Sequence, residues 1–214
     1  MKLSQTTLDY LKNFSTINNG IVINAGNKLI SMSNQRHVVG IAIVPDTFPQ
    51  TFGIYKLPEF LSVLSLFNEP ELTFEERYVI VQSGQNKIKY YYSNPDLIKQ
   101  PKRDTIPPYD SVLQELVITK ENFDRLNKSA AILKLEQIGI SSDGVRAFIP
   151  DNPTSNELKL DIEVTATDST ERCFKIEFLK MIPDTYNVKI TSGNFAVFTR
   201  ENCEVEYVVA MEMK

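Results

Sequence analysis

The chain begins with the stretch SQTTLDYLKNFSTI, residues 4–17, in which apolar residues recur at the three- and four-residue spacing of an α-helix. The residues on its apolar stripe are Leu3, Thr7, Tyr10, Leu11 and Phe14. The residues on the opposite, polar face are Gln5, Asp9, Lys12 and Thr16. Ser4 suits the N-cap, and Gly20 follows where the chain must leave the helix. We therefore predict an amphipathic helix followed by strands.

The same order of helix and strands recurs along the chain. Further amphipathic stretches lie at residues 57–67, 119–133 and 178–182. The strand-like runs are residues 20–24, 28–32, 38–44, 51–55, 72–75, 78–83, 87–92, 112–118, 136–142, 145–149, 158–166, 172–177, 186–191, 195–200 and 205–211. Leu8 and Phe123 are equivalent positions 115 residues apart, and Phe60 and Phe178 are 118 residues apart. The repeat predicts an α+β protein of two similar domains, each with two helices packed on antiparallel β-sheets.

A proline-rich stretch divides the two halves. Residues 94–110 contain Pro95, Pro101, Pro107 and Pro108 among polar residues. Proline cannot donate a hydrogen bond to a strand ladder and stiffens an extended chain. We therefore predict an N-terminal domain at residues 1–93, a connector at 94–110 and a C-terminal domain at 111–214.

The composition excludes several classes of protein. Hydrophobic residues make up 42% and charged residues 23%, as in folded globular proteins. No apolar run approaches the ~18 residues of a membrane span, and residues 1–5 lack the apolar core of a secretory signal. The net charge of −4 argues against a protein that binds nucleic acid through an overall positive charge. Cys173 and Cys203 are too few for a disulfide framework, and we expect both to be reduced rather than joined.

Signals of enzymatic chemistry are scarce. His37 is the single histidine, and neither a phosphate-binding loop nor a glycine-rich dinucleotide motif occurs. Two carboxylate clusters contain Glu69, Glu71, Glu75, Glu76, Glu201, Glu204 and Glu206. In turns and on edge strands such carboxylates are typically solvated charges, although paired acids also serve acid–base chemistry. We predict a protein without enzymatic activity, cofactor or metal site.

Cations on the polar helix faces are the feature that remains. The candidate DNA-binding residues are Lys12, Lys120, Arg125, Lys128 and Lys180. Each helix alone is best interpreted as an ordinary solvated face, because Asp9, Glu121 and Asp124 lie nearby. If the duplicated units align their helices along one surface, the cations form a single patch. Such a patch suits sequence-independent contact with phosphates.

Several short segments carry a resemblance to a known family. Near the N-terminus they are Met1-Lys2-Leu3-Ser4, Leu11-Lys12-Asn13-Phe14, Thr16-Ile17-Asn18 and Gly20-Ile21. Later segments are Ile54-Tyr55, Leu57, Phe60-Leu61, Leu64-Ser65-Leu66 and Tyr207-Val208-Val209-Ala210. With these segments in this order, the chain resembles the sliding clamps, or DNA polymerase processivity factors, of T-even-type bacteriophages.

The resemblance implies a fold and a set of partners. It implies the DNA-clamp fold, in a homotrimeric ring joined head-to-tail around double-stranded DNA. The implied protein partners are the replicative DNA polymerase, an ATP-dependent clamp loader and late-transcription factors. The implied location is the cytoplasm of the infected bacterial host, without membrane attachment.

The resemblance also bears on individual residues. Lys12, Lys128 and Lys180 match basic positions of the family's inner helices, whereas Arg125 is assigned by helix geometry alone. Partners of such clamps insert a hydrophobic peptide beside the connector, and the apolar residues available here are Ile106, Tyr109 and Val208. Packing within the core or the connector is the alternative role for these three residues.

Two other functional classes are compatible with the residues. One is a monomeric, sequence-independent DNA-binding module, and the other is a structural assembly protein built from the same repeat. The mass of the protein in solution distinguishes a ring from a monomer.

Overall fold

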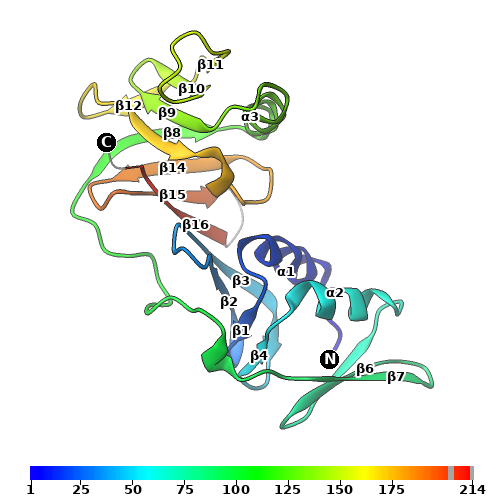
Figure 1. The fold of residues 1–214 in the computed structure, drawn as a ribbon. Coiled ribbons are helices and arrows are strands. Elements are labelled where there is room, and N and C mark those ends of the chain that lie inside the picture. The colour runs from blue at the N-terminus through cyan, green and yellow to red at the C-terminus, as the bar shows by residue number, and fades with distance from the viewer. Residues whose placement is uncertain (202–204, 213–214) are drawn as a thin grey trace. The chain divides into compact units, whose positions relative to one another are not determined.

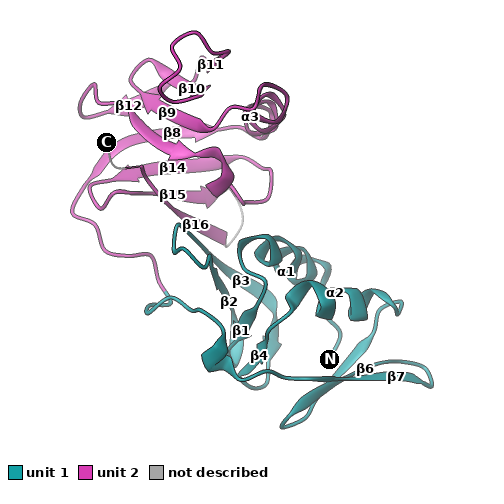
Figure 2. Cartoon of the chain, in the orientation of Figure 1, with its two compact units in different colours: residues 1–104 teal, residues 105–214 magenta. Residues whose placement is uncertain are grey.

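The computed structural model describes residues 1–201 and 205–212 (Figure 1). The chain divides into two compact units, residues 1–104 and 105–214 (Figure 2). The division falls within the stretch that the prolines single out as a connector. The predictions for Cys203 and Glu204 lie outside the described residues.

Helix α1 (Gln5–Ile17) forms where the periodicity predicts it and buries the predicted face. Ser4 is its N-cap, and the Ser4 side chain accepts a hydrogen bond from the Thr7 backbone N–H at 3.2 Å. Tyr10, Leu11 and Phe14 are each at most 3% exposed. The exposed face is therefore the polar one, which carries Lys12.

Helix α1 packs against strand β3 (Val38–Phe48) at Gly40. A Cβ atom added to Gly40 would lie 2.6 Å from the Phe14 ring, so any side chain there would clash. Because Phe14 is fully buried, the ring has no room to move away. Gly40 therefore sets how closely α1 can approach the strand.

The remaining strands of unit 1 are antiparallel and form small sheets. Their bounds are β1 (Ile21–Ile23), β2 (Gly26–Met32), β4 (Phe52–Ile54), β5 (Glu71–Phe74), β6 (Tyr78–Ser83) and β7 (Asn86–Tyr91). β1 pairs with β4, β2 pairs with β3, and β5, β6 and β7 form a three-stranded sheet. Helix α2 (Leu57–Ser65) contacts α1 and has Pro58 in its first turn, where the missing N–H has no helical partner to lose. A 3₁₀ turn, η1 (Pro95–Leu97), follows in the connector.

Unit 2 repeats the order of a strand, a helix and further strands. It contains β8 (Val112–Ile118), α3 (Lys120–Leu133), β9 (Gln137–Ser141), β10 (Gly144–Phe148), β11 (Leu158–Leu160), β12 (Val164–Ala166), β13 (Arg172–Lys175), η2 (Ile176–Phe178), β14 (Tyr186–Thr191), β15 (Phe195–Arg200) and β16 (Val205–Ala210). One sheet has the order β11-β10-β9-β13, and another runs β12-β8-β14-β15-β16. All these pairs are antiparallel, which confirms the predicted α+β class.

The predicted fourth helix, at residues 178–182, is wrong. The structure instead has a single 3₁₀ turn, η2, in which the Leu179 N–H donates to the Ile176 carbonyl at 3.0 Å. Only seven residues separate β13 from Pro183, and a residue before proline avoids the helical region. Phe178 and Met181 are buried nonetheless, at 6% and 4% exposure, so the segment reaches the core without a helix.

A predicted strand at residues 158–166 is divided into two. β11 pairs with β10, whereas β12 pairs with β8, so the chain passes from one sheet to the other at residues 161–163. Ile162 lies at this crossing, and its N–H donates to the Leu160 carbonyl at 3.1 Å. Alternation of apolar residues predicts the strand but not the change of sheet.

Asp46 of β3 ties the strand to the start of α1. Its Oδ2 accepts hydrogen bonds from the Ser4 N–H at 2.8 Å, the Ser4 hydroxyl at 2.7 Å and the Thr7 hydroxyl at 2.5 Å. Burial raises the pKa of Asp46, but the hydrogen bonds from Thr7 and Ser4 outweigh it and hold the pKa below its ordinary value. A carboxylate is also favoured at the positive end of a helix.

We predict that Asp46→Asn lowers the free energy of unfolding by about 1–3 kcal/mol at about pH 7, because it removes charged hydrogen bonds at a helix end. The folded-state pKa is depressed, so this stabilisation exists above the unfolded pKa of about 3.9 and disappears as the pH falls through the folded pKa. Urea denaturation followed by circular dichroism, at neutral and acid pH, measures the difference. The exposed Asp143→Asn is the control, and an Asp46→Asn effect of equal size at both pH values would contradict the prediction.

Candidate nucleic-acid interface

Helix α3 presents three of the five predicted DNA-binding residues. Phe123, Leu126 and Ala130 are buried on one side of the helix. At 100° per residue, Arg125 and Lys128 lie on the opposite side and are exposed. Lys120 is the first residue of the helix. The exposed face of α3 is therefore the best-defined candidate for contact with phosphates.

The loop before β14 fixes the start of α3. The Lys120 backbone N–H donates to the Thr185 hydroxyl at 3.1 Å, and the Thr119 hydroxyl accepts from the Asn122 N–H at 3.3 Å. The neighbouring Asp184 is bound by the Arg200 guanidinium and by the Thr185 N–H. Burial raises the pKa of Asp184, and these hydrogen bonds hold it below its ordinary value despite that. The first turn of α3 is thus held in place from outside the helix.

Two of the three cations on α3 are paired with acids of the same helix. Lys120 Nζ lies 2.8 Å from Asp124 Oδ2, and an Arg125 nitrogen lies 2.8 Å from Glu121 Oε1. Within residues 1–201 and 205–212, Lys128 has no carboxylate at ion-pair distance. Exposed pairs four residues apart contribute only about 0.3–0.5 kcal/mol each. A phosphate can therefore replace either acid at small cost.

The other two predicted residues have different surroundings. Lys12 lies on the exposed face of α1, 3.9 Å from Asp9, and Asp9 also accepts from the Gln5 amide at 2.7 Å. Lys180 lies in the coil after η2, because the helix predicted to carry it is absent. Its side chain is half-buried. At the start of α2, Lys56 is 3.6 Å from Glu59. The charges on α1 and α2 are thus balanced by neighbouring acids.

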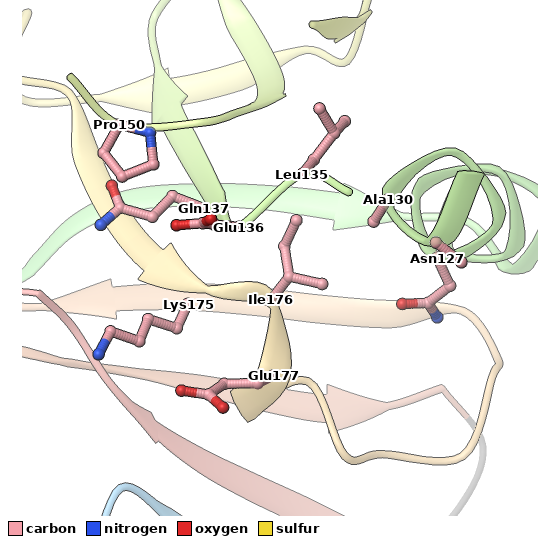
Figure 3. A pocket seen from close by; sticks show the side chains of 10 residues that line it. Asn127, Ala130, Leu135, Glu136, Gln137, Pro150, Lys175, Ile176 and Glu177 are labelled. Atoms are coloured by element: carbon pink, nitrogen blue, oxygen red, sulfur yellow. The ribbon is translucent and has the colours of Figure 1, made fainter. Parts of the chain in front are cut away.

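A cavity of about 630 Å³ lies beside α3 (Figure 3). Its apolar lining includes Ala130, Leu135 and Ile176, and its charged residues are Glu136, Glu177 and Lys175. Figure 3 shows Ile176 and Glu177 on the side of η2, across from the helix. Two carboxylates against one lysine leave the cavity without an excess of positive charge, so the exposed face of α3, and not its flank, is the phosphate-facing candidate.

Two of the three predicted partner-binding residues, Tyr109 and Val208, lie beside β15. The Tyr109 ring lies edge-on to Phe195, with centroids 6.0 Å apart, and Tyr109 is 38% exposed. Val208 is buried and pairs with Val197, while Phe195 pairs with Ala210 on the same face of the sheet. Ile106 is half-buried. Phe195 was not predicted, because an aromatic residue in an apolar strand looks like ordinary core.

Features of other site classes are absent from the described residues. The described part of the chain holds no group of three or more histidine, cysteine, aspartate or glutamate side chains that could bind a metal. Among the same residues, no helix is long and apolar enough to cross a membrane.

Comparison with known proteins agrees with the sequence resemblance. Residues 2–98 match the family described as DNA polymerase processivity factor. The sliding clamp of Vibrio phage KVP40 is 31% identical, and the alignment covers 99% of both chains. The sliding clamp of Enterobacteria phage T4 is 24% identical, with 99% of this chain and 97% of that one covered.

Solved structures extend the similarity of the fold. The structure of A. fulgidus PCNA bound to the C-terminal region of FEN-1 matches with a TM-score of 0.71 at 13% identity, and the match covers 100% of this chain and 97% of that one. The PCNA of Entamoeba histolytica has a TM-score of 0.67 at 13% identity, with 97% and 95% covered. At this level of identity the match concerns the fold, and it confirms the predicted DNA-clamp architecture.

We predict that Glu121→Gln with Asp124→Asn strengthens binding to linear duplex DNA, because Arg125 and Lys120 lose their intrahelical partners. The slope of log affinity against log salt steepens by up to about 2, since two more cations become available to phosphates. Fluorescence anisotropy over a salt series measures both effects. Glu69→Gln with Glu71→Gln is the control. If the affinity and the salt slope change equally in the two double variants, α3 does not contact DNA.

Proposed function

Because this chain belongs to the sliding-clamp family, we propose that it encircles duplex DNA and tethers the replicative DNA polymerase for processive replication. The observation that carries this proposal is the charge pattern of α3. Its three cations face solvent, but two of them are partly neutralised by acids one turn away. Such a face contacts phosphates weakly and without regard to sequence.

A weak electrostatic contact suits movement along DNA. Each cation that neutralises a phosphate adds to the affinity and also to the barrier for leaving that phosphate. A protein that slides must therefore be retained by something other than charge, and ring closure is the natural means. The net charge of −4 is consistent with retention by topology.

We propose that the ring closes through two different strand edges. β7 ends the three-stranded sheet of unit 1, and β11 ends the four-stranded sheet of unit 2; no strand of the described chain pairs with their outer edges. The other ends of these two sheets are occupied. Met1 exchanges hydrogen bonds with Leu72 of β5, and the Glu212 N–H donates to Cys173 of β13. Unlike edges on one chain favour a head-to-tail contact, which forms a ring when the rotation closes.

The charges around these two edges are complementary in sum. β7 carries Lys87 and Lys89, whereas the segment 157–163, which contains β11, carries the exposed acids Glu157, Asp161 and Glu163 against the single exposed cation Lys159. Opposite charges across a contact steer association and oppose pairing of like edges. The charge pattern thus favours β7 against β11 over contacts between two copies of the same edge.

Tyr91 is the side chain best suited to anchor this contact. Tyr90 packs on Phe60 of α2, with ring centroids 5.1 Å apart, so Tyr91 points to the other face of β7 and is 64% exposed. A hollow of about 750 Å³ in unit 2 is lined by Val117, Ile162 and Val188 together with polar side chains that include Glu115, Glu163 and Lys189. A large aromatic residue at a free edge and a hollow of mixed apolar and polar lining near the other edge are features of interfaces in which an aromatic anchor is surrounded by polar contacts.

The remaining assignments belong to the same proposal. Three copies form the ring, an ATP-dependent clamp loader opens it, and late-transcription factors are further partners. The polymerase docks by an apolar peptide beside the connector, at Ile106, Tyr109 and Val208. The protein is a non-enzymatic tether in the cytoplasm of the infected bacterial host. Its domains are residues 1–93 and 111–214, joined by the connector 94–110.

We predict that the protein, once a clamp loader and ATP have placed it on nicked circular duplex DNA, stays there during gel filtration at raised salt, because a closed ring cannot leave a circle. Cutting the circle with a restriction enzyme should release the protein, since the phosphate contacts alone are weak. Equal retention on circular and linear DNA would support the monomeric DNA-binding module instead.

We predict that Tyr91→Asp raises the concentration for half-dissociation of the oligomer about 10-fold or more, as expected when an interface anchor is lost. Analytical ultracentrifugation over a dilution series measures this concentration. Tyr55→Asp is the matched control, because Tyr55 is 53% exposed but lies outside β7. A wild-type protein that is monomeric at every concentration would exclude the ring, and equal effects of the two variants would exclude β7 as the contact.

A further inference from the structure

Two segments of unit 1 contain cations but no acidic residue. The chain carries 27 aspartates and glutamates, yet none of them lies within residues 10–45 or within residues 97–103. Outside α1, the cations of these two segments are Lys28, Arg36, Lys99, Lys102 and Arg103. In a chain with a net charge of −4, such segments are strongly basic by comparison with the rest.

The fold of unit 1 brings the two segments together. Lys99 Nζ donates to the Asn34 carbonyl at 2.7 Å, just beyond the end of β2. Near the start of β2, Lys28 Nζ donates to the Asp104 carbonyl at 3.2 Å and to its carboxylate at 3.1 Å. Residues 99–104 therefore run along β2 in the opposite direction. All five cations belong to unit 1, and we define them as the basic strip.

The basic strip lies on the side of β2 that faces away from α1. The Ser31 hydroxyl donates to the Phe14 carbonyl of α1 at 3.4 Å, and Leu29 is fully buried. Successive side chains of a strand point to opposite faces, so Lys28 points away from the helix. Asp104 is bonded to Lys28, which places this part of the connector on the same side.

Most of the charge of the strip is available to a ligand. The hydrogen bond and charge of Lys28 hold the pKa of Asp104 below its ordinary value, so these two groups offset each other. Lys99 binds a carbonyl and keeps its full charge. Arg36, Lys102 and Arg103 are exposed, and none of the three has an ion pair with any described residue.

The length and the polar groups of the strip suit a row of phosphates. Asn34 and Lys28 are six residues apart along an extended chain, or about 20 Å, which is the length of about six phosphates along one strand of a duplex. Exposed amide side chains lie among the cations, namely those of Asn27, Asn34, Gln35 and Gln100. Lysine, arginine and amide side chains are the groups that bind phosphate oxygens without reading sequence.

Other kinds of ligand fit the strip less well. No aromatic residue occurs within residues 24–36 or 97–104, so the bases of a single strand would have no ring on which to stack. Residues 99–104 contain no large apolar side chain that could anchor a peptide. The backbone of a duplex needs neither feature.

We infer that the basic strip binds the phosphate backbone of a second duplex segment, distinct from the one that α1 faces. That the two segments are distinct rests on the proposed function, in which the helix faces meet the encircled duplex. The strip contact is independent of sequence and is screened by salt. It gives the protein a hold on DNA that does not require a closed ring.

The test measures binding of the full-length protein to a short fluorescent linear duplex by anisotropy over a salt series. Lys102→Gln with Arg103→Gln should make the slope of log affinity against log salt shallower by up to about 2, because two phosphates lose their cations. At low ionic strength the same variant should bind the duplex ~5-fold more weakly, as expected for two exposed charged contacts. Adding Arg36→Gln should reduce the slope by up to about 1 more.

A matched control removes the same charges from another part of unit 1. Lys2→Gln with Arg77→Gln also replaces one exposed lysine and one exposed arginine, and it should keep the wild-type slope. Retention on circular DNA after loading reports on the clamp, and it should be the same in Lys102→Gln with Arg103→Gln as in the wild type. Loss of that retention in the wild type would count against the proposed function and not against the strip.

Four outcomes would overturn the inference. An unchanged slope in Lys102→Gln with Arg103→Gln would exclude the strip as a DNA contact, and an equal fall in both double variants would show an effect of net charge alone. Tighter binding of a single strand than of the duplex, lost in the strip variant, would assign the strip to single-stranded DNA. An oligoglutamate peptide whose binding is lost in that variant, with duplex binding unchanged, would assign it to an acidic protein.

Discussion

The close contact between α1 and β3 is the constraint on which unit 1 depends. Phe14 occupies the space above Gly40 that a side chain would otherwise fill, and Asp46 holds the helix start from the far part of the same strand. These two contacts fix both the height and the direction of the helix on the strand. Once they are made, the face that carries Lys12 has no orientation open to it except toward solvent. The placement of a functional side chain thus follows from a core contact on the opposite side of the helix.

Much of the fold could be predicted from hydrophobic period and capping. α1 and α3 are long enough for the 3.6-residue period to be clear, and Ser4 caps α1 as expected, just as Thr119 caps α3. The prediction of a fourth helix was wrong because residues 178–182 bury Phe178 and Met181 whether or not they are helical. The apolar pattern therefore did not distinguish a helix from coil. The prediction of one continuous strand at residues 158–166 was wrong for a similar reason, since the alternation of apolar residues does not show which sheet each part joins.

The residues of the candidate site could be proposed from the sequence, but most of the contacts around them could not. The cations of α3 and their acid partners are spaced four residues apart, so their pairing is readable from the sequence. Phe195 beside Tyr109 required the fold, because the two residues are far apart in the chain. Likewise, the hydrogen bond from Lys28 to the Asp104 carboxylate joins residues that are 76 positions apart in the chain. Long-range contacts of this kind decide which cations are already satisfied and which remain for a ligand.

The passage of residues 161–163 from one sheet to the other has a mechanical consequence. β11 is bonded to β10 and β12 to β8, so residues 161–163 are held on each side by a different ladder. A single edge strand of three residues has only one such ladder to hold it. An outward pull on residues 161–163 loads both ladders at once, because one flanks the segment on each side. These residues are therefore harder to lift from unit 2 than the length of either strand suggests.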